Sequence, residues 1–331
     1  MKKTLIAMLS VVLLGGVLPA KTTIKIATLA PEGSAWYDVI KTMGDDWKKA
    51  SNGEVVVKIY PGGIAGDEGD VIRKIRLGQL QGGAITSVGL SDVASEISAL
   101  QMPMMIQSYE ELDWILGKVG AKLEARIEVK GLKVLNWGDA GWVKFFAQKP
   151  VVYPEDLKDQ TMFVWGSDTS VVAAWKDAGF KVVPLAPTDI MTSLQTKMIN
   201  AFSTTPLAAA AFQWFGLAKN MTDINWACLI GATVVDKKAW EKIKPEIRVK
   251  LEEIAKESGI KLKKEVRGLE AIATDIMVKN GLVVHKLPAD AVKDWTEKAK
   301  GAYPRILSTP ELKAMYEEVN KLHEEYIKGK K

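Results

Sequence analysis

Apolar residues recur along this chain with two different periods, that of a strand and that of a helix, and segments of the two kinds follow each other in turn. Residues 23–27 alternate position by position, as strands do, and residues 55–60 are a second predicted strand, whereas residues 35–51 and 67–77 have apolar side chains at helical spacing. A strand of small residues at 83–88 follows. This order of strand, helix, strand, helix and strand predicts an α/β sheet with helices on both faces.

The same alternation begins again in the second half of the chain, after a helix predicted over 109–129 and a strand predicted at 132–137. The second set consists of predicted strands at 163–165, 181–184, 201–203 and 227–234 and predicted helices at 169–179 and 188–198. Two such sets, joined by more than one crossing of the chain, predict two α/β lobes around a cleft.

Residues 244–280 keep the helical period without interruption. A helix of that length is about 55 Å long at 1.5 Å per residue, which exceeds what one small lobe needs. We expect it to run along both lobes, with Gly259 and Gly268 as positions where it could bend. A strand at 282–284 and two charged helices complete the chain.

The expected division of the chain follows from these elements. Residues 1–20 are a predicted signal peptide, residues 21–142 with about 230–272 form the first lobe, and residues 143–229 with about 273–331 form the second. The signal prediction rests on Lys2 and Lys3, an apolar run over 5–17 and a small residue, Ala20, before a possible cleavage site. The run is too short for a membrane anchor. We therefore expect a periplasmic protein that does not span the membrane after cleavage.

Composition agrees with a globular protein of two domains. The chain has 331 residues, of which 47% are hydrophobic and 26% charged. A formal net charge of +5, with Lys and Glu interspersed, predicts no nucleic-acid partner. The one cysteine, Cys228, excludes an intramolecular disulfide and is expected to be buried.

The residue patterns of common enzymes are missing from this sequence. His285 and His323 are the only histidines, and neither stands at a metal-ligand spacing from another His or Cys. There is no phosphate-binding glycine loop and no GxSxG nucleophile motif. An acidic cluster at residues 67–70 is explained by its place at a helix start. We therefore predict neither catalysis nor a metal or other cofactor.

Aromatic residues near strand ends are the strongest candidates for ligand contact. Phe163 and Trp165 share one face of a predicted strand that follows a proline-led turn at 153–158. The carboxyl ends of strands line the crevice of open α/β sheets, although any single aromatic residue could equally fill a core. The candidate ligand-binding residues are Trp36, Trp137, Trp142, Phe163, Trp165, Pro187, Phe202, Ser203, Thr205 and Trp214.

The order of several short segments resembles one family, the substrate-binding proteins of tripartite ATP-independent periplasmic (TRAP) transporters of the DctP type. The segments are residues 24–36, Tyr60-Pro61-Gly62-Gly63, residues 72–88, Pro154-Glu155-Asp156-Leu157-Lys158, and Ser193-Leu194-Gln195-Thr196 leading to Pro206. The resemblance implies a two-lobe periplasmic-binding-protein-like fold with hinge strands and a long helix spanning both lobes. It also implies a small-molecule ligand, small and large TRAP membrane subunits as partners, and a monomer.

The sequence departs from this family where the family binds carboxylates. The arginine expected on the strand after the Asp-Leu-Lys segment is Phe163, and a second basic position is Val143. Burying a carboxylate without a cation costs several kcal/mol. We therefore expect a ligand that is apolar, or at least not a simple dicarboxylate, in an aromatic cleft.

Other functions stay open at this point. The ligand could be a carboxylate, including a C4-dicarboxylate, with Lys144 or Lys181 in place of the arginine. The protein could be the receptor of an ATP-driven (ABC-type) importer, an exported enzyme on the same fold, or a protein that presents its ligand to a membrane sensor.

Overall fold

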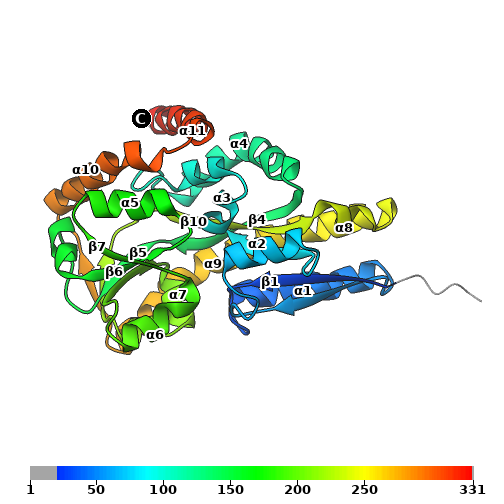
Figure 1. Cartoon of the computed structure of the whole chain (residues 1–331), viewed down its shortest axis with the longest axis horizontal. Coiled ribbons are helices and arrows are strands. Elements are labelled where there is room, and N and C mark those ends of the chain that lie inside the picture. Colours follow the sequence, from blue (N-terminus) through cyan, green and yellow to red (C-terminus); the bar gives the residue numbers. More distant parts are fainter. Residues whose placement is uncertain (1–20, 330–331) are drawn as a thin grey trace, which may run out of the picture.

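A computed structural model describes residues 21–329, which form two α/β lobes side by side (Figure 1). The predicted fold class is thereby confirmed. The predicted signal peptide at 1–20 lies outside the described residues. Within the part that is described, none of the helices is long and apolar enough to cross a membrane.

The first lobe is built on a five-stranded sheet in the order β2-β1-β3-β10-β4. β1 is parallel to both its neighbours, and β10 is antiparallel to β3 and β4. Its strands are β1 (Thr22–Thr28), β2 (Val55–Tyr60), β3 (Gly82–Thr86), β4 (Leu132–Trp142) and β10 (Cys228–Asp236). Its helices are α1 (Ala35–Ala50), α2 (Glu68–Arg76), α3 (Ser87–Ser91), η1 (Ser95–Gln101), α4 (Tyr109–Val129) and α8 (Lys237–Glu241).

The second lobe is built on a six-stranded sheet in the order β11-β9-β5-β8-β6-β7. Its strands are β5 (Lys144–Ala147), β6 (Thr161–Trp165), β7 (Lys181–Leu185), β8 (Ala201–Thr204), β9 (Asn220–Asp223) and β11 (Val283–Lys286). Its helices and 3₁₀ turns are η2 (Pro154–Asp159), α5 (Thr169–Asp177), η3 (Pro187–Asp189), α6 (Ile190–Gln195), α7 (Pro206–Ala211), η4 (Trp214–Gly216) and α10 (Ala289–Ile306).

Side-chain caps explain where several helices begin. The side chains of Ser34, Asp67, Ser108 and Asp168 each accept a hydrogen bond from a backbone N–H in the first turn of α1, α2, α4 and α5 respectively. Such caps satisfy donors that have no partner within the helix. The sequence placed these helix starts correctly, to within one residue.

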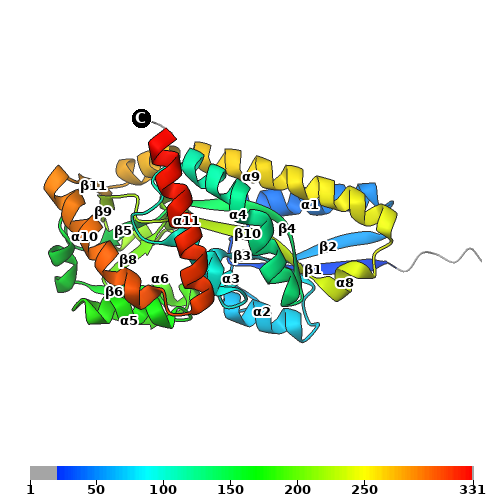
Figure 2. The same ribbon diagram turned by 90° about the horizontal axis from the view of Figure 1, so that it is seen from above.

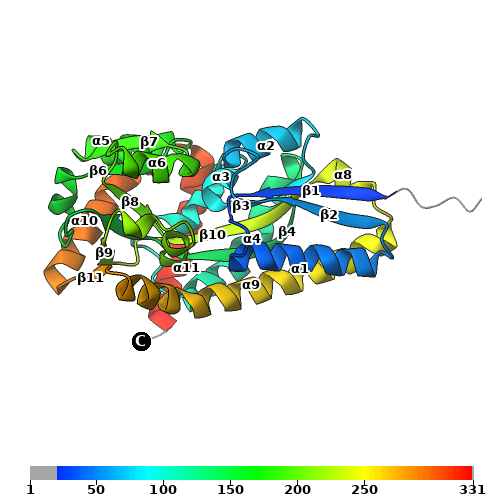
Figure 3. The ribbon, with the colours of Figure 1, turned by 90° about the horizontal axis from the view of Figure 1, so that it is seen from below.

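The long helix α9 (Pro245–Lys279) has 35 residues and passes from one lobe to the other, as Figures 2 and 3 show. This confirms the helix predicted to span both lobes. Gly259 lies where α9 presses on β4, because a Cβ there would stand 2.7 Å from Asn136 Cβ and 2.9 Å from the Trp137 carbonyl oxygen. Gly259 thus permits close approach of helix and strand within an unbroken helix.

The two last helices pack on different lobes. α10 lies against α5, and Trp295 donates a hydrogen bond to the Val152 carbonyl at 2.8 Å. α11 (Pro310–Gly329) returns to the first lobe, where Lys122 pairs with Glu318 and the rings of Trp114 and Tyr326 are 5.7 Å apart. The stretch 273–331, expected in the second lobe, is therefore shared between the two.

The cores of the two lobes differ in composition. Aliphatic side chains make up most of both cores, but the core of the second lobe is richer in aromatic rings. In the second lobe Phe146 and Phe202 stack with centroids 5.0 Å apart, and Phe145 stacks on Trp295 at 4.9 Å. Cys228 is buried, as expected.

Candidate ligand-binding cleft

A cavity of about 350 Å³ lies between the lobes and takes its lining from both. Its size falls in the range of sites for small organic molecules. It lies at the ends of β1, β3, β6 and β8, where the chain leaves each strand. This cavity, called the main cleft below, is the candidate site.

The second lobe supplies most of the aromatic rings that line the main cleft. Phe163 and Trp165 come from β6 with ring centroids 6.2 Å apart, and the rings of Phe212 and Trp214 stack at 4.6 Å. Pro187, Ile190 and Met191 line the same side, which also carries the hydroxyls of Thr188, Ser203, Thr204 and Thr205. Flat rings of this kind give a ligand a large contact area while losing little side-chain freedom.

The first lobe supplies both apolar and polar parts of the lining, and its apolar part includes Leu29, Ile40, Ile85 and Leu262. Its polar part consists of Thr28, Glu68, Thr86, Asn136, Asp139 and Thr233. Trp36 is the aromatic residue of the first-lobe wall, and its indole N–H donates to the Asp139 carbonyl oxygen at 3.1 Å. That bond fixes the ring against the end of β4.

Glu68 is a buried carboxyl in the polar part of the lining. It accepts hydrogen bonds from the Thr86 N–H at 2.7 Å, the Thr86 hydroxyl at 2.6 Å and the Gly89 N–H at 3.0 Å. Burial raises the pKa of Glu68 to about 7, despite these three donors. Its hydrogen-bonding capacity is thus used largely within the protein.

Cations are absent from the lining of the main cleft within residues 21–329. Lys144 is buried in the second lobe, where its ammonium group donates to Asp223 at 2.9 Å and to the Ile224 carbonyl at 3.4 Å. Lys181 is exposed at the start of β7 and does not line the cleft. The two lysines considered for an anionic ligand are therefore both elsewhere in this structure.

The structure brings most of the sequence-predicted residues together. Seven of them line the main cleft: Trp36, Phe163, Trp165, Pro187, Ser203, Thr205 and Trp214. The other three have different surroundings. Trp137 donates to Glu124 at 2.8 Å, Trp142 packs 5.4 Å from the Tyr109 ring, and Phe202 is fully buried on Phe146.

Several lining residues escaped the sequence analysis. Thr28 and Thr86 stand at the ends of β1 and β3, so the strand-end rule applied to aromatic residues would have found them too. Asn136 and Phe212 carried no such signal. The sequence analysis explained Glu68 only by its place at the start of a helix. Its backbone is indeed in the first turn of α2, but its side chain lines the main cleft.

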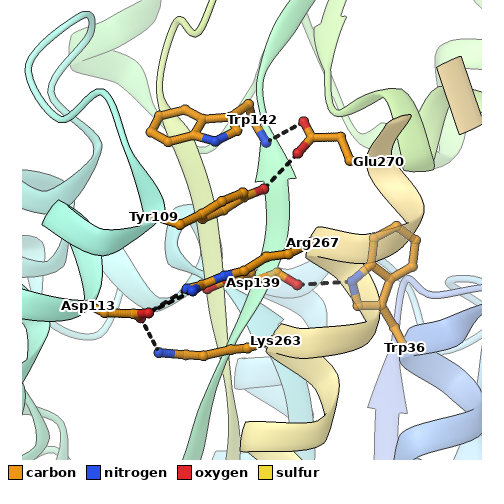
Figure 4. A network of polar contacts seen from close by, with 8 residues as sticks. All are labelled: Trp36, Tyr109, Asp113, Asp139, Trp142, Lys263, Arg267 and Glu270. Atoms are coloured by element: carbon orange, nitrogen blue, oxygen red, sulfur yellow. Dashed lines mark hydrogen bonds and ion pairs between the residues drawn. The ribbon is translucent and has the colours of Figure 1, made fainter. Parts of the chain in front are cut away.

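Beside the cleft, α9 is tied to the first lobe by a charged network (Figure 4). Arg267 donates to both oxygens of Asp113, at 2.6 and 2.9 Å, and to Asp139 Oδ2 at 2.6 Å. Lys263 donates to Asp113 at 2.9 Å. Burial acts to raise the pKa of Asp113, but the bonds from Arg267 and Lys263 outweigh it and hold that pKa below its ordinary value.

The same helix face continues the network toward the crossing between the lobes. Glu270 accepts hydrogen bonds from the Tyr109 hydroxyl at 2.7 Å and from the Trp142 backbone N–H at 3.1 Å. The Arg267 guanidinium lies 4.4 Å from the centre of the Tyr109 ring. These residues, called the hinge network below, join α4, α9 and the end of β4 where the chain leaves the first lobe.

Two α/β lobes, a long shared helix and a cleft between the lobes define a solute receptor. The family model described as bacterial extracellular solute-binding protein, family 7 (DctP), matches residues 26–309, and the chain belongs to that family. It is a substrate-binding protein of the TRAP type, and its family consists of receptors, not enzymes.

Individual relatives agree with this assignment. The chain is 27% identical over 227 residues to the 2,3-diketo-L-gulonate-binding periplasmic protein YiaO of Escherichia coli, covering 66% of this chain and 67% of that one. It is 21% identical over 256 residues to the C4-dicarboxylate-binding periplasmic protein DctP of Vibrio cholerae, covering 77% of each. A TRAP solute-binding protein from Xanthobacter autotrophicus, crystallised with β-D-galacturonate, has the same fold, with a TM-score of 0.83, 22% identity, and 90% of this chain and 99% of that one covered.

Proposed function

We propose that this receptor binds a small organic ligand that is apolar, or at least not a simple dicarboxylate, in the main cleft. The observation that carries the proposal is the lining: rings and aliphatic side chains, hydroxyls from both lobes, the amide of Asn136, and no Lys, Arg or His within the described residues. Phe163, which is 1% exposed, stands at the position to which the sequence resemblance assigns an arginine.

Electrostatics support this ligand class. A carboxylate in the main cleft would lose its hydration without gaining a guanidinium partner, at a cost of several kcal/mol. The Glu68 carboxyl, partly ionised near its pKa of about 7, would add repulsion. A neutral molecule that is mostly apolar, with a few hydrogen-bonding groups, avoids both costs and matches a lining of apolar side chains and hydroxyls.

A carboxylate ligand is the second candidate, and the relatives favour it. Diketogulonate, C4-dicarboxylates and galacturonate are all anions, and proteins bearing those names are similar to this chain. For such a ligand Lys144 would have to leave Asp223, to which it is bonded at 2.9 Å. The charges of the cleft therefore support the first candidate more directly.

The proposal extends to the transport system. The receptor would act in the periplasm after removal of the signal peptide, as a monomer, and deliver its ligand to the small and large TRAP membrane subunits, which an ion gradient drives. Pull-down of the receptor by its own membrane subunits in the presence of ligand is the direct test of this part.

The ligand class is tested by native mass spectrometry of the purified protein, with denaturing extraction of whatever is bound, and by calorimetry. We expect a neutral, partly apolar molecule, no binding of succinate by the wild type, and succinate binding by Phe163→Arg. Tight binding of succinate by the wild type would overturn the proposed ligand class and leave the receptor function intact.

A further inference from the structure

A second cavity of about 160 Å³, called the side cavity below, adjoins the main cleft. Val88 and Gln101 of the first lobe and Val164 and Val171 of the second contribute to its lining. Its deepest wall is aromatic and consists of Trp175, Phe180, Trp226 and Trp295. It therefore lies between the lobes, on the side of the second sheet that carries α5 and α10.

The two cavities share part of their lining. Trp165, Ser203, Thr204 and Leu229 line both. Trp165 is the last residue of β6 and is half-buried, so its ring stands between the two spaces. A molecule in the main cleft thus needs to pass only these side chains at the strand ends to reach the side cavity.

The aromatic wall of the side cavity is held in place by its own contacts. The rings of Trp226 and Trp295 are 5.7 Å apart at 77°, and those of Trp175 and Trp226 are 5.6 Å apart. Trp295 directs its N–H away to the Val152 carbonyl. Phe180 packs edge-on against Trp175 at 4.9 Å. The wall is a fixed apolar surface.

The volume of the side cavity suits a ring. Apolar cavities near 150 Å³ inside proteins accept benzene. Polar groups stand among the other lining residues, with Gln101 already donating to the Cys228 carbonyl at 3.4 Å. A phenyl-sized or short alkyl group fits the aromatic wall, while two charged residues, Asp168 and Lys298, line the cavity elsewhere, and Lys298 pairs with Glu155 at 3.0 Å.

We propose that the side cavity is a subsite for an apolar group of the transported ligand, whose polar part lies in the main cleft. The inference rests on the proposed function and adds the shape of the ligand: a polar head joined through a short linker to a group the size of a phenyl ring. The linker passes Trp165 at the strand ends.

Two parallel series of compounds test the subsite by calorimetry. One consists of phenylalkanols and the other of phenylalkanoates, each with one to four methylene groups between ring and head. Affinity is expected to rise about fourfold per added methylene once the ring enters the side cavity. The head group tests the proposed function, because a preference for alkanoates would overturn it, while the dependence on length tests the subsite in either series.

Filled variants localise the effect. Ala302→Trp on α10 places a ring in the side cavity, and Lys300→Trp places the same ring on the exposed side of that helix. Ala302→Trp should lower the affinity for the longer compounds at least tenfold and leave the affinity for the shortest unchanged. Lys300→Trp should leave the affinity for every compound unchanged. Ala178→Phe, at the end of α5, provides a second filled variant if Ala302→Trp fails to fold.

Xenon binding gives a readout that needs no ligand. Crystals of the wild type under xenon pressure should show a bound atom against Trp175, Trp226 and Trp295, and crystals of the filled variant should not. Affinities that do not depend on length, an equal effect of the Ala302 and Lys300 variants, or the absence of binding in both series would overturn the subsite.

Discussion

The main cleft and the hinge network lie side by side, but within the described residues only the hinge network contains cations. The cleft has two carboxyls, Glu68 and Asp139, and no cation among its described lining residues. The hinge network, a few residues away, concentrates Arg267 and Lys263 on carboxylates of the first lobe. Asp139 belongs to both regions, and its charge is matched by Arg267 on the network side.

The cations Arg267 and Lys263 thus lie beside the cleft and not in its lining. Their ion pairs join α9, which passes from one lobe to the other, to α4 and β4 of the first lobe, whereas the lining of the cleft consists mainly of apolar side chains and hydroxyls. Ion pairs at close, fixed distances favour one geometry. A cleft without them can accept a neutral molecule without leaving a buried charge unpaired.

The largest expected effect comes from removing the central cation. Arg267→Met leaves the Asp139 carboxylate, whose side chain is 1% exposed, without its partner. We expect a loss of about 3 kcal/mol in the free energy of unfolding, measured in urea. Lys261→Met, an exposed neighbour on the same helix, should change it by less than about 0.5 kcal/mol. Equal losses in both variants would contradict a special role of the network.

Next in size is the pH dependence set by Glu68. Its pKa in the folded protein, about 7, is above the ordinary value of 4.5, so the folded state holds this proton more tightly than the unfolded state does. The contribution of Glu68 to the free energy of unfolding is therefore complete below pH 4.5 and is lost as the pH rises toward 7.

Comparison with Glu68→Gln isolates that group, because the other titrating residues are common to both proteins. Between pH 4.5 and pH 8 the wild type should lose about 3 kcal/mol of unfolding free energy relative to the variant. Urea titrations at four pH values measure it. If the free energy of unfolding changed with pH in the same way in both proteins, the pKa of Glu68 would not be raised in the folded state.

A smaller effect is expected at the mouth of the cleft. Gly63, in the first lobe, has φ +76°, and a Cβ there would lie 2.6 Å from Thr188 Cγ2 of the second lobe. Gly62, with φ +63°, has nothing within 4 Å of that position. Both alanine variants bear a similar backbone strain of about 1–2 kcal/mol, and only Gly63→Ala pushes the lobes apart.

Small-angle scattering should therefore find a larger radius of gyration for Gly63→Ala than for Gly62→Ala or the wild type. The same radius for all three proteins would mean that the Thr188 side chain moves aside without any opening of the lobes.

The smallest effect concerns Trp36. Trp36→Phe keeps the ring in the cleft wall but removes the N–H that donates to the Asp139 carbonyl oxygen. A loss of about 1 kcal/mol in unfolding free energy is expected. A change several times larger would mean that the indole has a packing role beyond this bond.

Much of the fold could be predicted because periodicity and caps are local. The helix starts after Ser34 and Ser108 and the 35-residue α9 followed from the sequence pattern. β9 was missed, since Asn-Met-Thr-Asp at 220–223 has no strand pattern of its own and is held by its neighbours β5 and β11. Pairing of that kind is a tertiary effect.

The candidate site was predicted in part, for a similar reason. Phe202 and Ser203 are adjacent on β8, so their side chains point to opposite faces, and which face meets the cleft depends on the other lobe. Trp142 is an aromatic residue at a strand end, yet α4 brings Tyr109 against it and makes it core. Strand ends locate the cleft, but the packing of neighbouring elements decides which side chains face it.

The path of the chain between the lobes has a mechanical consequence. It crosses at Val143 and returns between β9 and β10, where Trp226 and Ala227 exchange backbone hydrogen bonds with Val143. It crosses again along α9, and finally between α10 and α11, where Ser308 contacts Ser170 and Thr309 contacts Ser95. Two bodies joined at one point can turn about any axis, but several tethers at separate places remove most of those rotations. The lobes are thus left with a narrow choice of movements, and ligand entry must occur through one of them.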